Sequence, residues 1–474
     1  MSKKFTRSLI MLLCIAMITA LCGMSAFAED EAADVAEIVE TGEKYTNFVQ
    51  AFYDASYAAQ TIRMLDDVNV TLSEALEFNL FGSSKVFTID LNGHDINFGL
   101  VGGSKIHPAI FMTGRNGKFV IKGNGSINAE GRAIEVQSGI FAEPNVAIEN
   151  GAAVISQSEV ALFVSTGDAV VDVSGTVKSQ AEDAGAIMGD GNYATGTGSI
   201  TIHDGACVEA VNHAIYFPQG GSLNITGGTI KSQDTTAIEM RRGSLNISGN
   251  PIITTGAKGY NVRRNDSGST TNGAAVAIAP YSGSAINVDI SGGTFTGKKA
   301  LSYANPNPAT NFTATINVTG GKFSTDITEA LTNAEVKSNI SEYAVAANED
   351  GTYGVEERNE AFEKVAAVHK AGDKTLTFLA GINNLDYTKA GFRVTLNGQE
   401  QEIPTSTVYT ALAVNGETVN STEKFGTKYF FAANIVINDD NIAGFTIKPF
   451  ATLINGDEVS AKEPTKVTLT GGAE

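Results

Sequence analysis

Short apolar segments that begin with alanine recur along the middle of the chain. Each begins with an alanine followed by an aliphatic residue, and the segments start at Ala109, Ala133, Ala161, Ala186, Ala214, Ala237, Ala275 and Ala300. The spacings between them are 24, 28, 25, 28, 23, 38 and 25 residues. A period of this length is typical of repeat proteins, in which each unit stacks on its neighbour.

A second kind of segment lies between these and runs into a glycine turn. Its clearest form is 223–230, where apolar and polar residues alternate, and it returns at 245–252, 288–295 and 316–323 and more loosely at 89–96, 119–127 and 200–208. Alternation with a period of two indicates a β-strand with one buried face. Two or three short strands per repeat predict a parallel β-solenoid, in which each coil lies on the previous one.

Stacking of the coils predicts an inward and an outward column for the alanine-led strands. The inward column contains Ile110, Ile134, Leu162, Ile187, Ile215 and Ile238. The outward column contains Phe111, Glu135, Phe163, Met188, Tyr216, Glu239, Ala277 and Ser302. The inward side chains are expected to form one continuous core, and the outward ones a lateral face of the rod.

The repeated Ser/Thr-Gly-Gly-x-Phe/Ile phrase resembles the right-handed parallel β-helix of the pectate-lyase-like superfamily. More narrowly, it resembles the repeat-bearing surface proteins of gut Firmicutes, over roughly residues 60–355. The resemblance implies a fold far more than an activity. We therefore predict an all-β protein with a right-handed parallel β-helix at 64–356, preceded at 29–63 by an N-terminal segment with an amphipathic capping helix.

The end of the chain is predicted to be a separate β-sandwich at 371–474, after a linker at 357–370. Alternating segments in this region are divided by turn sequences such as Asn397-Gly398, Asn415-Gly416 and Asn455-Gly456. The segments 385–387, 391–392, 408–409 and 448–450 resemble the immunoglobulin-like modules that end many Firmicutes surface proteins. That resemblance implies a role in attachment or spacing.

The first 28 residues have the pattern of a removed secretory signal peptide. Lys3, Lys4 and Arg7 precede an apolar run at 9–21, and Ala26-Phe27-Ala28 offers small residues for cleavage. A lipoprotein signal with Cys22 is the alternative, although Leu21 is bulky where a small residue is expected. The apolar run is too short to span a bilayer, so we predict no transmembrane helix and a secreted or cell-surface location.

Composition narrows the range of partners. The chain has 33 Lys and Arg against 52 Asp and Glu, a formal charge of −19, which disfavours binding to nucleic acid. After cleavage Cys207 is the one remaining cysteine, so no internal disulfide is expected. The five histidines do not pair at metal-ligand spacing, and no phosphate-binding loop occurs. We predict no metal, no cofactor and a monomer.

No catalytic residue is predicted. A calcium-dependent lyase needs clustered carboxylates, but the outward acids of the second strand, Asp90, Asp172 and Asp289, are several coils apart. A glycoside hydrolase needs paired carboxyl groups, and no such pair is evident. Short acidic turns at 190–192 and 438–441 are possible calcium turns, but such turns more often hold no metal.

One lateral face is a candidate binding surface. Tyr216 and Glu239 are expected to be neighbours on consecutive coils, with Arg241 and Arg242 just beyond them. An aromatic ring beside hydrogen-bonding charges suits a sugar, although the chain has no Trp. Two alternatives stay open: long turns cover these side chains, or Glu239 simply pairs with an arginine. The candidate binding residues are Glu135, Phe163, Tyr216, Glu239, Arg241 and Arg242.

The longest spacing contains an insertion at 256–273, which either carries function or has no role. Together these patterns predict a secreted or cell-surface, non-catalytic protein that binds a glycan or another surface partner through one lateral face. The alternatives are a carbohydrate-active enzyme, either a polysaccharide lyase or a glycoside hydrolase, and a structural spacer.

Overall fold

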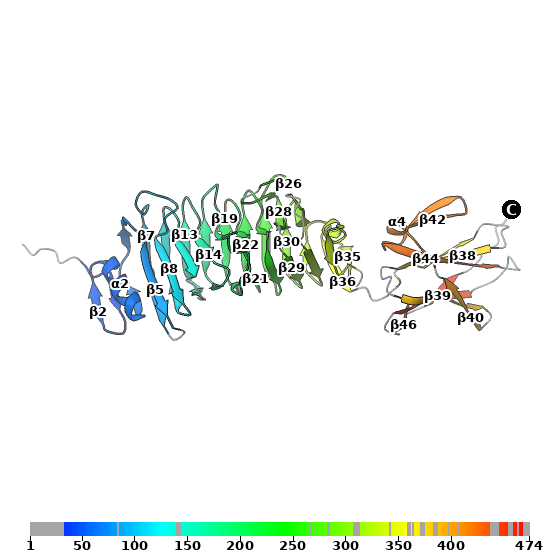
Figure 1. Ribbon diagram of the computed structural model, residues 1–474, viewed down its shortest axis with the longest axis horizontal. Helices are drawn as coiled ribbons and strands as arrows, with labels where there is room; N and C mark the ends of the chain where they lie inside the picture. Colours follow the sequence, from blue (N-terminus) through cyan, green and yellow to red (C-terminus); the bar gives the residue numbers. More distant parts are fainter. Residues whose placement is uncertain are drawn as a thin grey trace, which may run out of the picture.

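Three long sheets run along the greater part of the protein (Figure 1). The computed structural model describes residues 33–82, 85–138, 144–265, 268–281, 285–306, 313–340, 343–357, 362, 365–369, 375–382, 387–396, 398–405, 407–436, 445–453, 458–461 and 464–467. The predicted signal peptide at 1–28 and the acidic turn at 438–441 therefore lie outside the described residues.

Each coil contributes one strand to each sheet. The coil after Ala161, for example, gives β14 (Leu162–Ser165) to one sheet, β15 (Val170–Val173) to the second and β16 (Thr176–Ser179) to the third. From β3 to β34 in the second sheet, and throughout the first, neighbouring strands run parallel. The protein is a parallel β-helix with three faces, as the sequence period predicts.

The alanine-led strands form the nine-stranded sheet. Besides β14, its strands are β5 (Leu76–Phe81), β8 (Ile110–Arg115), β11 (Ile134–Ser138), β17 (Ile187–Gly189), β20 (Ile215–Phe217), β23 (Ile238–Met240), β28 (Ala274–Ile278) and β31 (Lys299–Tyr303).

The alternating segments before the glycine turns form the thirteen-stranded sheet. Its strands, besides β15, are β2 (Glu43–Tyr45), β1 (Ala36–Ile38), β3 (Thr61–Met64), β6 (Val86–Asp90), β9 (Lys118–Lys122), β12 (Asn145–Ile148), β18 (Ser199–Ile202), β21 (Ser222–Ile225), β24 (Gly243–Ile247), β29 (Ala285–Ile290), β32 (Thr313–Val318) and β34 (Val336–Ser338).

The segments after those turns form the twelve-stranded sheet. Its strands, besides β16, are β4 (Val68–Val70), β7 (His94–Phe98), β10 (Gly125–Ala129), β13 (Ala152–Ser156), β19 (Cys207–Ala210), β22 (Thr229–Ser232), β25 (Ile252–Thr255), β30 (Thr294–Thr296), β33 (Lys322–Phe323), β36 (Tyr353–Glu357) and β35 (Tyr343–Ala347).

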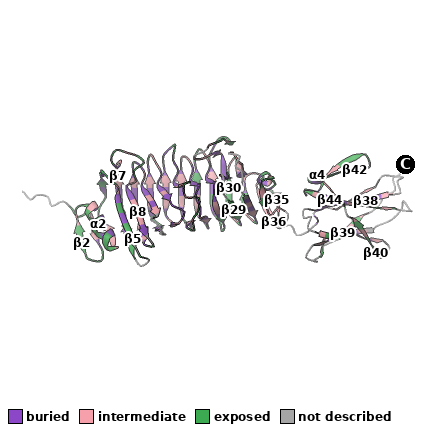
Figure 2. Ribbon diagram, in the orientation of Figure 1, coloured by how far each residue is buried: buried purple, intermediate pink, exposed green. Residues whose placement is uncertain are grey.

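The predicted columns of the nine-stranded sheet are confirmed residue by residue. Ile134 pairs with Ile110 and Leu162, and Ile215 pairs with Ile187 and Ile238. The inward residues are at most 2% exposed and belong to one hydrophobic cluster that extends along the whole β-helix. Figure 2 shows the same alternation of buried and more exposed positions along the strands.

One register in the thirteen-stranded sheet differs from the sequence prediction. Asp90 pairs with Lys122, and it is Thr88 that lies beside Val120. Asp90 therefore stands one outward position further along β6 than expected, where its carboxylate lies 3.6 Å from Arg63 Nε. The first coil precedes the regular repeat, so spacing alone does not fix its register.

A short helix covers the N-terminal end of the coils, as predicted. In α2 (Phe48–Ala58) the side chain of Asn47 caps the first turn by accepting from the backbone N–H groups of Val49 and Gln50. Phe52 is fully buried and contacts the rings of Phe78 and Phe87 at 5.6 and 5.2 Å between centroids. The helix thereby shields the apolar end of the solenoid from water.

The other end closes with antiparallel strands. After α3 (Thr328–Leu331) the chain forms β34, and β36 then pairs antiparallel with both β33 and β35. Reversal of strand direction ends the parallel stacking and pairs the edge of the twelve-stranded sheet.

The C-terminal part has its own antiparallel sheets and its own core. One sheet contains β37 (Val365–His369), β38 (Thr375–Ile382), β44 (Tyr429–Val436) and β41 (Val408–Tyr409). The other contains β40 (Gln399–Thr405), β39 (Tyr387–Leu396), β45 (Phe445–Leu453), β46 (Glu458–Ser460) and β47 (Thr465–Val467). Phe378, Phe392 and Phe431 from the two sheets share one cluster, which makes this part a β-sandwich.

The sandwich differs in detail from the prediction. Strand β37 lies within the expected linker 357–370 and pairs with β38, so the domain begins earlier than the turn signals suggest. A hairpin of β42 (Ala411–Val414) and β43 (Glu417–Asn420) leads into α4 (Ser421–Phe425).

In the described part of the chain, no helix combines the length and apolar character needed to cross a membrane.

The stacked column predicts a large stability difference between two chemically identical substitutions. Ile187→Ala removes a fully buried side chain from the column, and we expect it to lower the free energy of unfolding by about 2–5 kcal/mol. Ile252→Ala removes the same atoms from a side chain that is 48% exposed, so it should cost much less. Urea unfolding followed by circular dichroism measures both; equal effects would contradict the stacked core.

Candidate functional site

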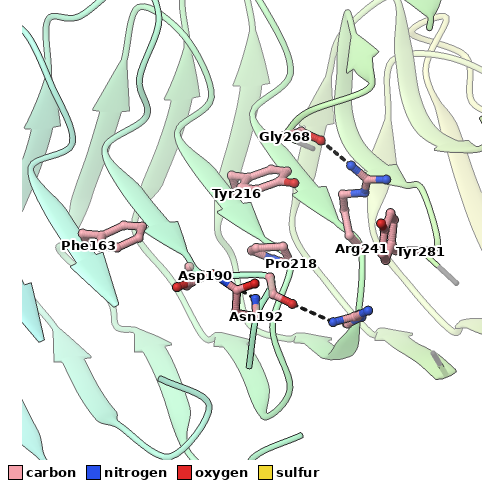
Figure 3. A pocket seen from close by; sticks show the side chains of 11 residues that line it. Phe163, Asp190, Asn192, Tyr216, Pro218, Arg241, Gly268 and Tyr281 are labelled. Atoms are coloured by element: carbon pink, nitrogen blue, oxygen red, sulfur yellow. Dashed lines mark hydrogen bonds between the residues drawn. The ribbon is translucent and has the colours of Figure 1, made fainter. Parts of the chain in front are cut away.

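A cavity of about 350 Å³ opens on the outer face of the nine-stranded sheet, near the C-terminal ends of β14, β17, β20 and β23 (Figure 3). Three aromatic residues line it, Phe163, Tyr216 and Tyr281. Its polar lining is Asp190, Asn192, Arg241 and Arg242. The cavity is of a size that binds small ligands, and it combines rings with a few polar groups.

Glycines create the hollow. Gly189, Gly191 and Gly268 all line the cavity, and none of them has a side chain to fill it. A Cβ atom on Gly189 would lie only 2.5 Å from Oε1 of Gln219, so any larger residue there would displace the Gln219 side chain.

Gln219 holds the turn that carries Asp190, the acidic residue of the cavity lining. Its side chain is buried, donates to the carbonyl oxygen of Thr166 and accepts from the backbone N–H of Asp190 at 3.0 Å. The Asp190 carboxylate in turn accepts from the backbone N–H of Asn192 at 2.9 Å. This is a local turn held by hydrogen bonds. Within the described ranges no three His, Cys, Asp or Glu side chains gather as metal ligands.

Arg241 forms the opposite wall and is almost completely buried, with 2% of its surface exposed. Its Nε donates to the carbonyl oxygen of Ala279 and its Nη1 to that of Gly268, while the guanidinium lies 5.1 Å from the Tyr281 ring centroid. Nη2 has no hydrogen-bond partner. Arg242 donates from Nη1 to the carbonyl oxygen of Gly191 at 2.8 Å and also lies over Tyr281.

Tyr216 lies between the two walls. Burial raises the pKa of its hydroxyl to about 12, against the opposing effect of the nearby Arg241 guanidinium. The hydroxyl therefore stays protonated at neutral pH and can donate a hydrogen bond. Figure 3 shows it directed toward Arg241, while Asp190 and Phe163 lie on the other side of the cavity.

The carboxylate of Glu239 is buried beneath the long insertion and holds it by hydrogen bonds, and we call this contact the Glu239 clamp. Its carboxylate accepts from the backbone N–H and the hydroxyl of Thr270, both at 2.8 Å, and from the backbone N–H of Thr271 at 3.2 Å. His213 Nε2 lies 3.2 Å away. Burial by itself raises the pKa of Glu239. The His213 contact and the hydrogen bonds from Thr270 lower it by more than burial raises it, so the pKa lies below its ordinary value.

The described residues of the insertion are arranged around Glu239. Strands β26 (Asn261–Val262) and β27 (Thr271–Asn272) pair antiparallel, so the segment crosses the face as a hairpin. Because Glu239 holds Thr270 and Gly268 accepts from Arg241, the same segment both covers the strand and forms part of the cavity wall. Residues 266–267 lie outside the described ranges.

The structure brings four of the six predicted binding residues to the cavity: Phe163, Tyr216, Arg241 and Arg242. Glu239 is next to Tyr216, as its strand register predicts, but it is fully buried and does not line the cavity. Its partner is His213, not an arginine. The insertion thus covers Glu239, whereas Phe163 and Tyr216 remain at the cavity.

Glu135 also lies outside the cavity. Its carboxylate pairs with Arg132 Nη1 at 2.6 Å and accepts from the Ser165 hydroxyl at 3.3 Å. The Arg132 guanidinium lies 4.3 Å from the centroid of the Phe163 ring. Arg132 therefore links Glu135 to the cavity wall, and Glu135 supports Phe163 indirectly.

Sequence reasoning missed Asp190, Asn192, Pro218 and Tyr281 as members of the site. The sequence indicates only a possible calcium turn at Asp190 and Asn192. Their position directly after β17, the strand next to that of Tyr216, is the signal that places them in the site. Tyr281 follows the coil after the insertion, and no periodic pattern marks it.

Comparison of the chain with protein-family models, with curated proteins and with solved structures finds no match.

Neutralising the clamp should loosen the insertion. The Glu239 carboxylate contacts four hydrogen-bonding groups. In Glu239→Gln the side chain keeps its shape but loses its charge and one acceptor oxygen, and we expect about 1–3 kcal/mol of destabilisation. Hydrogen exchange at the Thr270 and Thr271 amides should become faster. Glu135→Gln is the control, since its carboxylate is partly exposed and does not contact the hairpin. Unchanged exchange at both amides would show that Glu239 does not hold the loop.

The same clamp predicts acid sensitivity. Because the folded state lowers the pKa of Glu239, its carboxylate stabilises the fold above the ordinary glutamate pKa, and this contribution is lost as the pH falls through the folded-state pKa. The difference in unfolding free energy between the wild type and Glu239→Gln should therefore shrink in acid. Denaturation over a pH series measures it, and a difference that grows toward low pH would reverse the assigned sign.

Proposed function

We propose that this protein is an exported, non-catalytic β-helix protein that binds a glycan in the cavity on its nine-stranded face. The observation that carries the proposal is the lining of that cavity, where Phe163, Tyr216 and Tyr281 surround one carboxylate and two guanidinium groups. Aromatic rings cover the apolar face of a sugar, and Asp190, Asn192 and the arginines suit its hydroxyl groups.

The cavity favours binding over hydrolysis. Glycoside hydrolysis ordinarily uses two carboxyl groups on either side of the scissile bond. Among the described residues that line the cavity, Asp190 is the one carboxylic acid, because Glu239 is buried and bonded to the hairpin. Tyr216, with its raised pKa, is a hydrogen-bond donor and a poor base.

The finer family assignment is part of the same proposal. The glycine phrase supports a right-handed coil of the pectate-lyase-like kind, and the tail supports an immunoglobulin-like module that spaces or attaches the rod. A secretory signal at 1–28 and the acidic composition support a secreted or cell-surface location. On this reading the long parallel core is a rigid support that presents one face to a surface glycan.

Glycan-array screening followed by calorimetry tests the proposal. Asp190→Asn removes the carboxylate from the cavity while keeping its shape, and we expect affinity for the bound glycan to fall by about 1.5–3 kcal/mol, which is roughly tenfold or more. Asp289→Asn is the matched control, because it makes the same change on the exposed face of the thirteen-stranded sheet. Failure to bind any glycan, or equal losses in the two variants, would contradict the proposal.

A further inference from the structure

Arg241 carries a buried positive charge without a counter-ion in the described part of the chain. Its hydrogen bonds go to two backbone carbonyl oxygens, and Nη2 has none. Only 2% of the Arg241 surface is exposed. A buried guanidinium normally pairs with a carboxylate, because removing an unpaired charge from water is costly.

The acid that precedes Arg241 on strand β23 does not compensate this charge. Glu239 is two residues before Arg241, but its carboxylate is occupied by His213 and by the N–H groups of the hairpin. Asp190 lies across the cavity, where it accepts from the backbone of its own turn. Asp190 and Arg241 thus line opposite sides of the cavity, with Tyr216 between them (Figure 3), and Arg242 donates to the carbonyl oxygen of Gly191 beside Asp190.

We propose, building on the proposed glycan site, that the ligand is an acidic sugar whose carboxylate is bound at Arg241. The carboxylate supplies the counter-charge that the described residues do not, and the protonated Tyr216 hydroxyl donates to the same end of the sugar. The hydroxyl groups at the other end face Asp190 and Asn192, and Phe163 lies beside the ring.

The charge of the cavity favours a carboxylate over a phosphate. A phosphate monoester carries about −1.5 to −2 at neutral pH, whereas a carboxylate carries a single charge. The lining holds two guanidinium groups and one carboxylate, a net charge of +1 that a single carboxylate neutralises and a phosphate monoester exceeds. A single anionic group close to Arg241 and far from Asp190 fits this distribution.

Matched ligands test this without any change to the protein. Oligosaccharides that contain uronic acid, and glycans that end in sialic acid, are compared with the same molecules after reduction of the carboxyl group to a neutral alcohol. We expect the full-length protein to bind one of the acidic series between about 10-fold and about 100-fold more tightly than its reduced counterpart, the range for a charged hydrogen bond. The two series distinguish the two sources of the carboxylate.

A pair of variants locates the effect. Arg241→Gln should abolish the preference for the acidic glycan, while Arg263→Gln, which removes the same charge from an exposed position on the insertion, should leave it unchanged. If Arg241→Gln does not fold, the comparison of acidic and reduced glycans on the wild type still decides the question.

The outcomes separate the two proposals. Equal affinity for acidic and reduced glycans would overturn the carboxylate assignment and leave the glycan site intact. Absence of binding to every glycan would overturn both. Tighter binding of peptides with a free C-terminal carboxylate than of any glycan would show that the cavity takes a different class of ligand, which also contradicts the inference.

Discussion

In-register stacking of parallel strands is the constraint on which the rest of this structure depends. Each coil pairs with the next so that residues at equivalent positions lie directly above one another, as Ile187 does between Leu162 and Ile215. Aliphatic side chains then form one continuous core, and the outward residues are fixed in rows by the same hydrogen bonds. In a solenoid each coil contacts only its neighbours, so a binding site forms where a coil departs from the repeat.

The departure occurs at the insertion between β25 and β28. The buried carboxylate of Glu239 holds this segment over the nine-stranded sheet, and the segment in turn supplies the carbonyl oxygen of Gly268 that accepts from Arg241. Two further irregularities, the Asp190 turn and the glycines beside it, leave the cavity open on its other side. A repetitive rod thus gains a polar and aromatic pocket from a few local exceptions, while the strands beneath it keep their register.

Periodicity was sufficient to predict the fold and the outward row of the nine-stranded sheet, because pairing of parallel strands leaves little freedom once the repeat is known. Tyr216 and Glu239 lie side by side as expected. Periodicity could not show that Glu239 is covered, since that depends on the path of a non-repetitive segment. Nor could it fix the register of Asp90, which lies before the regular repeat, or identify Tyr281, which lies after the insertion that interrupts it.

The spacing of the coils can be measured directly in solution. Spin labels on Thr201 and Asn246 are separated by two strand pairings, and labels on Thr201 and Asn317 by four, in a chain whose Cys207 is replaced by serine. With strands roughly 4.8 Å apart, stacking predicts that the backbone separation doubles, from roughly 10 Å to roughly 19 Å. Electron paramagnetic resonance distances that do not lengthen from the first pair to the second would contradict the parallel stack and the site built on it.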